Sequence, residues 1–300
     1  MDQLKCMTLF VEVVKAESFS AAAEKIGLSR AQVSKSVMQL ENHLGTRLLN
    51  RTTRRISLTE TGQIFYEGCK VILSDIEEIE CIASDQTNEP RGTLTLSAPT
   101  SFSILHLNEA MSGFLKLYPQ VRISMNLADR FIDVVAEGFD LVIRIAELED
   151  SSLIARRIAP CKRIFCASSE YLEQHGTPRT AKDLETHQCL IYANDAKPGS
   201  WVLHGPDGVE SVKVKGRIAA DNGDVLKSAA ISGLGIALLP TFIIGPDIRA
   251  GRLQQVLVDY CPPDISIYAV FPSHRYLSAK VRAFVDYLSE YFGDSPYWDQ

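Results

Sequence analysis

The amino-acid sequence predicts an α+β amino-terminal domain and a larger α/β domain, joined by a long helix. Three observations support this organisation. Residues 19–62 combine an Ala-rich helix, a glycine, a second capped helix and an arginine cluster between two short candidate strands. Residues 59–84 carry apolar side chains at alternating spacings of four and three, which indicates one long amphipathic helix. After Gly92, short apolar segments alternate with helical ones, as in α/β domains.

Two helices with a tight turn between them are predicted first. Ala21, Ala22 and Ala23 favour a helix and allow a close neighbour, and Gly27 can adopt the left-handed conformation that ends it. Ser29 and Gln32 have the spacing of a capping box at the start of the next helix. This order predicts a helix-turn-helix.

The second helix has two different faces. Val33, Val37, Leu40 and Leu44 form a narrow apolar stripe. The opposite face has small, polar, basic and flexible side chains: Ala31, Ser34, Lys35 and Met38. Such a face can enter a major groove about 12 Å wide. The alternative is an ordinary amphipathic helix with a solvated face.

Charge is distributed unevenly along the chain. With 31 Lys and Arg against 37 Asp and Glu, the whole chain argues against a nucleic-acid partner. However, residues 1–62 hold nine basic and six acidic residues, whereas residues 63–89 hold one basic and seven acidic residues. No acidic residue lies between Asn42 and Thr59, where Thr and Ser accompany Arg47, Arg51, Arg54 and Arg55. This segment suits phosphate oxygens and indicates the wing of a winged helix-turn-helix, with a solvated basic hairpin as the alternative.

A long helix is predicted from Thr59 to about Ser84. Its apolar positions are those of a coiled-coil seam: Phe65, Cys69, Ile72, Ile76, Ile79 and Ala83. The alternative is a core helix of a single globular domain. The polar run from Ser84 to Gly92 includes Pro90 and predicts a domain boundary.

Together these motifs resemble the LysR-type transcriptional regulators. The resemblance lies in SFSAAAEKIGLS, VSKSVMQLENHLGTRLLNRTTR and SLTETG, and continues through LSAPTSF, EGFDLVIRI, CASSEYLEQHGTPRT and GLGIALLP, so that it covers essentially the whole chain. The run NRTTR, Asn50 to Arg54, is similar to one subgroup of the family. The resemblance implies a DNA-binding regulator and not an enzyme, with residues 1–58 as the DNA-binding domain, 59–89 as the linker and dimerisation helix, and 90–300 as the effector-binding domain.

The resemblance also implies which residues contact DNA. Arg30, Ser34 and Lys35 are expected to contact base edges. Ser29 and Gln32 are expected either to contact DNA or to cap the start of the helix. Phosphate or minor-groove contacts are expected from Arg51, Thr52, Arg54 and Arg55. The family often has Gln where this chain has Arg30, which predicts a preference for guanine over adenine at one position.

The α/β domain has a regular series of predicted elements. Strands are predicted at 93–97, 121–127, 141–145, 161–167, 189–193, 212–219, 235–239 and 265–271, with helices near 102–117, 131–137, 222–232, 241–249 and 277–292. The resemblance implies two lobes of the periplasmic-binding-protein type 2, with lobe I at about 90–162 and 267–300 and lobe II at about 163–266. It places a small organic effector between them.

Ligands of open α/β sheets bind beyond the carboxyl ends of the strands, near helix amino termini. This rule selects ten candidate positions: Thr100, Ser101, Phe102, Asp129, Arg130, Arg144, Asn194, Asp195, Asn222 and Pro240. It also brings in Gly223, which follows Asn222 at a helix start, and Leu239, which precedes Pro240. Each one could equally be a satisfied structural residue, and Arg144 could pair with Asp140 or Glu147. The subgroup usually has a glycine directly after the SF of this LSAPTSF run, whereas this chain has Ser103.

Several other classes have little support. Seven cysteines without a CxxC pair do not indicate a disulfide framework, and no long apolar span or signal peptide is evident, so we expect a cytoplasmic protein with no membrane partner. Oxidation of Cys161 with Cys166 is a minor alternative, and His187 with Cys189 lacks the further ligands of a zinc site. No catalytic or phosphate-loop motif occurs.

The alternatives of an enzyme and of a solute-capture protein both leave residues 1–89 unexplained. No cofactor is expected. The partners expected are double-stranded DNA with an inverted repeat, the effector, a second copy through the linker helix, a tetramer through the sensor domains, and RNA polymerase.

Overall fold

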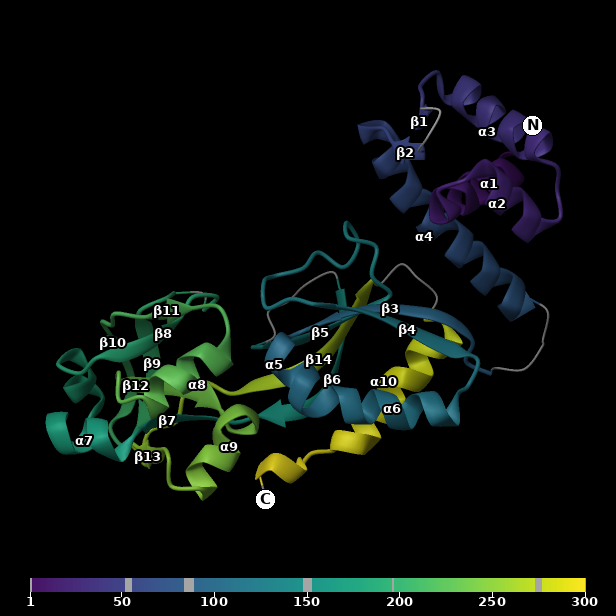
Figure 1. The fold of residues 1–300 in the computed structure, drawn as a ribbon. Coiled ribbons are helices and arrows are strands. Elements are labelled where there is room, and N and C mark those ends of the chain that lie inside the picture. The colour runs from purple at the N-terminus through teal and green to yellow at the C-terminus, as the bar shows by residue number, and fades with distance from the viewer. Residues whose placement is uncertain are drawn as a thin grey trace. The chain divides into compact units, whose positions relative to one another are not determined.

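The computed structural model describes residues 2–51, 56–83, 89–147, 153–195, 197–272 and 277–299. The chain divides into two compact units, Met1–Asn88 and Glu89–Gln300. Their helices and strands are labelled in Figure 1. Thr52, Arg54 and Arg55 of the predicted wing lie outside the described residues.

The first unit is built from helices and one two-stranded sheet. Its elements are α1 (Gln3–Ala16), α2 (Phe19–Ile26), α3 (Arg30–Leu44), β1 (Leu49–Arg51), β2 (Ile56–Leu58) and α4 (Glu60–Ala83). β1 and β2 pair antiparallel. Gly27 ends α2 with φ +72°, and Ser29 and Gln32 form the predicted capping box of α3. The helix-turn-helix expected from the sequence is present.

The core of this unit includes the apolar stripe of α3. Val33, Val37 and Leu40 are fully buried against α1. From α4, Cys69 is 1% exposed and Phe65 is partly buried in the same core. Both had been predicted for a seam between two chains. For Cys69 that prediction is wrong, because its side chain is enclosed in the core of its own chain, whereas Phe65 is only partly buried there and Ile72 remains 44% exposed.

The second unit contains two five-stranded sheets, which define two lobes (Figure 1). The sheet of lobe I has the order β4-β3-β5-β14-β6, with β3 (Gly92–Ala98), β4 (Val121–Leu127), β5 (Leu141–Ala146), β6 (Leu153–Cys161) and β14 (Ile265–Pro272). The sheet of lobe II has the order β11-β8-β12-β7-β13, with β7 (Arg163–Ala167), β8 (Cys189–Tyr192), β11 (Ala219–Ala220), β12 (Ile236–Pro240) and β13 (Gln254–Val256). A separate hairpin joins β9 (Ser200–Gly205) to β10 (Gly208–Lys213).

The two sheets share one pattern of strand directions. In each, the second strand in the order pairs in parallel with its two neighbours, β3 with β4 and β5, and β8 with β11 and β12. The remaining pairs are antiparallel. The chain passes from lobe I to lobe II between β6 and β7, and returns between β13 and β14. This arrangement agrees with the predicted α/β fold of two lobes.

Helices connect these strands or follow the last of them. They are α5 (Thr100–Phe102), the π-helix η1 (Ser103–Leu107), α6 (Asn108–Leu117), α7 (Ser169–His175), the 3-10 helix η2 (Ala181–Glu185), α8 (Gly223–Ile231), α9 (Thr241–Arg249), α10 (Ala279–Phe292) and the 3-10 helix η3 (Tyr297–Asp299). The predicted helix at 102–117 therefore contains a π-helical segment, which begins at Ser103.

Two element predictions are wrong. Residues 131–137 contain no helix; a turn covers 134–138 instead. Asp133 Oδ1 accepts hydrogen bonds from the Val135 and Ala136 amides, both at 3.0 Å, which favours a local turn. The strand predicted at 212–219 is also divided, since β10 ends at Lys213 and β11 begins at Ala219.

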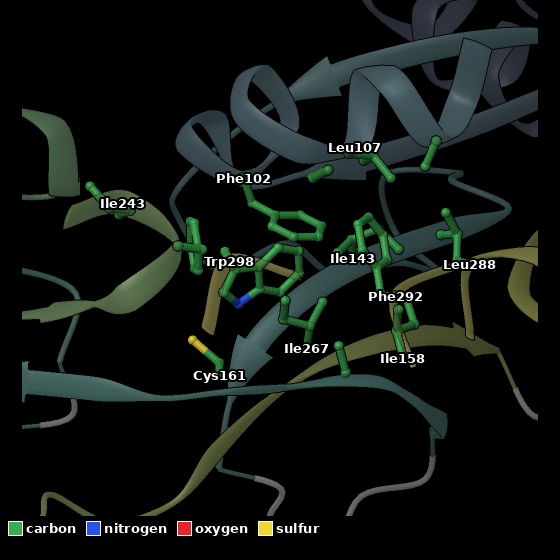
Figure 2. Packing of buried hydrophobic residues seen from close by; sticks show 14 of the residues in the cluster. Phe102, Leu107, Ile143, Ile158, Cys161, Ile243, Ile267, Leu288, Phe292 and Trp298 are labelled. Carbon is green, nitrogen blue, oxygen red and sulfur yellow. The ribbon is translucent and has the colours of Figure 1, made fainter. Parts of the chain in front are cut away.

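One hydrophobic cluster includes side chains of both lobes. Phe102 from lobe I lies 5.5 Å from the ring of Phe242 in lobe II, and both contact Trp298 near the carboxyl end of the chain. Figure 2 shows Trp298 beside Phe102 and Phe292 within this cluster. The lobes are therefore joined by buried aromatic side chains as well as by the two crossing segments.

Candidate nucleic-acid interface and effector site

The exposed face of α3 carries the predicted base-contacting residues. Arg30 and Lys35 are exposed and Ser34 is half-buried. Ser29 and Gln32 are also exposed, but their polar groups bond to each other: the Ser29 amide donates to Gln32 Oε1 at 2.9 Å, and the Gln32 amide donates to Ser29 Oγ at 3.3 Å. The capping role is thus observed for Gln32, which leaves Arg30 and Lys35 as the exposed basic groups among the predicted contacts on this helix.

A buried glutamate positions the strands that follow. Glu41 is 8% exposed, and its Oε1 accepts hydrogen bonds from the amides of Leu48 and Leu49 at 3.0 and 3.2 Å. Leu49 begins β1 and Leu48 directly precedes it, so Glu41 ties the start of the wing strand to α3. The sequence reasoning did not identify this residue. The sequence feature that could have indicated it is a carboxylate directly after Leu40 of the apolar stripe.

The other side of this turn is held by the start of α4. Thr59 Oγ1 donates to the Arg47 carbonyl at 2.8 Å, and the Thr59 amide donates to the Leu48 carbonyl at 2.9 Å. A Cβ at Gly62 would lie 1.9 Å from the Leu48 carbonyl oxygen, so only glycine fits there. Arg51 ends β1 opposite Ile56. The backbone leading to the predicted wing is therefore held on both sides.

In the second unit, Asp129 joins several predicted effector residues. Its Oδ1 accepts from the Thr100 amide at 2.9 Å and its Oδ2 accepts from Asn222 Nδ2 at 2.9 Å. Its backbone carbonyl accepts from Asn194 Nδ2 at 2.7 Å. Thr100 is the first residue of α5, so the carboxylate lies at a helix amino terminus. Residues of lobe I and lobe II thus meet around one carboxylate.

A second bridge between the lobes lies beside the first. Ser101, which is 5% exposed, donates to Asp224 Oδ2 at 2.6 Å. Lys227 Nζ lies 2.6 Å from Asp224 Oδ1, and the Asn222 side chain caps α8 by accepting from the Asp224 amide at 3.0 Å. Burial raises the pKa of Asp224, but the hydrogen bonds from Lys227 and Ser101 and the Lys227 charge together lower it below its ordinary value. Asp224 and Lys227 were not predicted, since no strand ends at either.

A third group of charges lies at the crossing segments. Arg163 begins β7, opposite Pro240 of β12, and its Nη2 donates to the Pro263 carbonyl at 3.1 Å. Burial lowers the pKa of Arg163 and raises that of Asp195, while each charge partly opposes the shift of the other. Burial and the nearby carboxylates, Asp129 among them, raise the pKa of Tyr192. The sequence predicted Asp195 and Pro240 here, but neither Arg163 nor Tyr192.

Three predicted residues have other partners. Phe102 is fully buried in the aromatic cluster. Arg130 forms a bidentate pair with Glu137, with both distances 2.7 Å, on the exposed surface. Arg144 donates to the Ile132 carbonyl at 2.9 Å and lies 4.0 Å from the centre of the Phe131 ring. These contacts give all three residues structural roles.

His106 links three segments in the same region. Its Nε2 lies 3.1 Å from the Phe242 carbonyl oxygen and its Nδ1 lies 2.6 Å from Tyr297 Oη. Because a carbonyl only accepts, Nε2 carries the proton and Nδ1 of the neutral ring accepts from the tyrosine hydroxyl. Burial lowers the pKa of His106. The neutral ring thus connects η1 to α9 and η3.

The cysteines within the described part are free thiols. Burial raises the pKa of Cys161, Cys166 and Cys189 to about 12 each, so the reactive thiolate is strongly disfavoured. Across the described ranges, no group of three His, Cys, Asp or Glu side chains could hold a metal ion. In the same part of the chain, no helix combines the length and apolar character needed to cross a membrane.

Comparison with known proteins gives consistent matches along the whole chain. The family model described as a bacterial regulatory helix-turn-helix protein of the lysR family matches residues 4–63, and the LysR substrate binding domain matches residues 87–293. An uncharacterised HTH-type transcriptional regulator of Haemophilus influenzae is 38% identical over 281 residues, which are 94% of this chain and 98% of that protein.

Two further similarities extend over nearly full length. The HTH-type transcriptional regulator DmlR of Escherichia coli is 36% identical over 292 residues, 97% of this chain and 95% of that protein. The solved structure of CrgA, a LysR-type transcriptional regulator from Neisseria meningitidis, is 32% identical with a TM-score of 0.60, and the match covers 95% of this chain and 97% of that one.

Proposed function

This chain belongs to the LysR family of bacterial transcriptional regulators, and we propose that Arg30, Ser34 and Lys35 are its contacts to base edges. The protein is a sequence-specific DNA-binding regulator whose activity responds to a small-molecule effector. The family and these relatives are regulators and not enzymes, so the enzyme alternative is excluded, and the helix-turn-helix match removes the solute-capture alternative.

The observation that most supports these base contacts is the geometry of α3. Its apolar stripe is buried on one side, while Arg30 and Lys35 are exposed on the helix surface outside it. Glu41 and Thr59 hold the backbone of the segment that leads into the wing. We propose that Arg51, Thr52, Arg54 and Arg55 contact phosphates or the minor groove, and that the NRTTR run marks the subgroup.

The DNA-binding proposal is tested by footprinting the full chain on the DNA upstream of its own gene, with a salt titration. We expect protection of an inverted repeat that weakens with salt. Arg54→Ala should weaken binding to all sequences and lower the salt slope by about one. Arg179→Ala, which removes an exposed arginine of the other unit, is the matched control.

An unchanged slope in Arg54→Ala would remove that residue from the interface. Absence of protection upstream of the gene would contradict self-regulation, and absence of selection from a genome-wide DNA pool would contradict the proposed contacts altogether.

For the second unit, we propose that the effector binds between the lobes, at the set of groups that includes Thr100, Ser101, Asp129, Asn222 and Asp195. The support is that side chains of both lobes meet there directly, Ser101 with Asp224 and Asp129 with Asn222. A ligand can shift the lobes only through different affinities for two arrangements. Phe102, Arg130, Arg144, Asn194 and Pro240 would then shape the surroundings.

We further propose a dimer through α4 and a tetramer through the effector-binding domains, acting in the cytoplasm on promoter DNA with RNA polymerase as a partner. A tetramer of this kind would carry two pairs of DNA-binding units and could span two DNA sites. Mass measurement of the full chain with and without operator DNA distinguishes a dimer from a tetramer.

A further inference from the structure

Residues 296–299, which contain η3, contact helices of both lobes. Tyr297 Oη lies 2.6 Å from Nδ1 of His106, which belongs to η1 of lobe I. The same imidazole reaches lobe II, where its Nε2 donates to the Phe242 carbonyl at 3.1 Å. The centre of the Trp298 ring lies 4.6 Å from that of His106 and 6.1 Å from that of Phe242. One short segment and one imidazole thus connect the two lobes.

This junction contains two features that are unusual for a permanent core. The first is an unpaired donor, since Trp298 is 5% exposed and its Nε1 has no hydrogen-bond partner within the described residues. Figure 2 shows this nitrogen on the side of the indole ring that faces Cys161. A buried donor without an acceptor loses its hydrogen bond to water and gains none in return. Release of the indole into water would restore that bond.

The second feature is the π-helical turn η1. The Asn108 amide donates to the Ser103 carbonyl, five residues earlier, whereas an α-helix bonds residues four apart. Such turns are rare and occur frequently at functional sites. Buried residues recur here every four positions, at Phe102, His106 and Ala110. Each step of four would rotate the side chain by about 40° around an α-helix of 3.6 residues per turn. The wider turn reduces this rotation, and so keeps His106 on the side of Phe102.

The outer side of residues 296–299 is open to water. Tyr297 is 45% exposed. The turn before η3 is held by an ion pair of Arg157 with Asp294 at 3.1 Å, in which the Asp294 side chain is 90% exposed. Exposed pairs of this kind contribute little to stability. The segment is therefore held mainly by the Trp298 ring and by the Tyr297 hydroxyl, and segments with few buried contacts open more readily than the cores around them.

We propose that residues 296–299 are a releasable latch between the lobes, and that this latch opens and closes together with the π-helical turn η1. In the closed state the Trp298 ring is buried and His106 bonds to both Tyr297 and lobe II. In the open state water satisfies the indole N–H, His106 loses the tyrosine hydroxyl, and η1 loses the contact that favours its wide turn. The latch goes beyond the proposed function, since it requires neither an effector nor a particular ligand site.

The experiment measures hydrogen exchange of the backbone amides in the folded full chain, at a series of low denaturant concentrations. We expect the amides of η1, η3 and the start of α9 to exchange through one common opening, with the same dependence on denaturant. This opening should be at least about tenfold more populated than the opening of the central strands β3 and β14. It should also depend less on denaturant, because it exposes less surface than global unfolding.

Two variants should open the latch to different extents. Tyr297→Phe keeps the ring but removes the hydroxyl that bonds to His106, and should raise exchange in η1 and η3 alike by about fivefold to tenfold. Trp298→Ala removes the buried ring and should raise both by more than Tyr297→Phe does. Slow exchange of β3 and β14 in each variant would show that the lobes remain folded. The matched control is Tyr291→Phe, which removes a hydroxyl from a tyrosine stacked on Tyr287 of α10 and should leave η1 and η3 unchanged.

Two results would overturn the latch. If Tyr297→Phe speeds exchange in η3 but not in η1, residues 296–299 open independently of the π-helical turn. If η1 and η3 of the wild type exchange only together with β3 and β14, these residues are a permanent part of the core and do not open while the lobes are folded.

Discussion

Residues between three and twelve positions apart make the hydrogen bonds that shape the DNA-binding unit, as in Ser29 with Gln32 and Thr59 with Arg47. In the effector-binding unit the comparable bonds join residues 93 and 123 positions apart, as in Asn222 with Asp129 and Ser101 with Asp224. The first site forms with its own local structure. The second exists only when both lobes are folded and close to each other.

This difference has a functional meaning. A recognition surface gains from rigid local bonds, because its side chains must keep one geometry against the DNA. A sensor gains from bonds between lobes, because each can be exchanged for a bond to a ligand at small net cost. Substitutions should therefore change the first unit locally and the second unit in the coupling between its lobes.

The largest effect is expected at Glu41. Glu41→Ala leaves the Leu48 and Leu49 amides without their buried acceptor, which should lower the free energy of unfolding by about 2–4 kcal/mol. Glu41→Gln retains an acceptor oxygen and should cost about 1 kcal/mol. Denaturant unfolding with a probe in the first unit measures both. Equal costs for the two variants would show that the charge, and not the acceptor, holds the turn.

The next effect concerns DNA affinity. Arg30→Gln should change the preferred base at one position of each half-site by about 1–3 kcal/mol, because arginine suits guanine and glutamine suits adenine. Selection from a randomised operator library measures the change. Uniform weakening across all sequences would instead indicate a phosphate contact for Arg30. A change in unfolding stability alone would not test the base preference.

An effect of similar size is expected from the bridge between the lobes. Asp129→Ala removes the acceptor of Thr100 and Asn222 and should destabilise the second unit by about 1–3 kcal/mol. Combining it with Asn222→Ala should cost less than the two separate losses together, because the variants share one bond. Hydrogen exchange at the Thr100 amide should increase in Asp129→Ala.

Asp133→Ala provides the control for this bridge. Asp133 also accepts two backbone amides, but both belong to its own turn in lobe I. Its loss should leave exchange at Thr100 unchanged. Strict additivity of Asp129→Ala and Asn222→Ala would contradict a direct coupling of the lobes through Asp129.

The same contrast explains what the sequence could predict. Gly27, Ser29 and the apolar stripe of α3 are local signals, and each forms the structure that it predicts. The helix predicted at 131–137 failed because Asp133 bonds to nearby amides instead. Short strands such as β13 have no strong sequence pattern of their own. They form by pairing with a strand that is distant in the sequence, here β7, and local sequence does not report that pairing.

For the candidate effector site, the strand-end rule selected Thr100, Ser101, Asp129 and Asn222, and the structure joins these four through hydrogen bonds. It could not select Arg163. What distinguishes that residue is the burial of Nε between segments about 100 positions apart, and no local spacing reports this.

The smallest expected effect is a pH dependence of the junction at His106. Burial lowers the pKa of His106 in the folded protein, so the unfolded chain binds more protons just below the ordinary value of about 6.5. Stability should be complete above that pH and decrease as the pH falls towards 5. One such group contributes at most about 1.4 kcal/mol per pH unit. Thermal unfolding from pH 7.5 to 5 measures the slope, above the range where Asp and Glu protonate.

His187 provides a second contribution of the same sign, because burial also lowers its pKa, although it lies in lobe II and bonds to Tyr171. His106→Gln and His187→Gln should each flatten the pH dependence in part. Only His106→Gln should also alter the contact of η3 with α9, because that ring alone bonds to both Phe242 and Tyr297. A wild-type slope in His106→Gln would mean that the imidazole accepts its proton in the folded state, and that Tyr297 and Phe242 tolerate the charged ring as well as the neutral one.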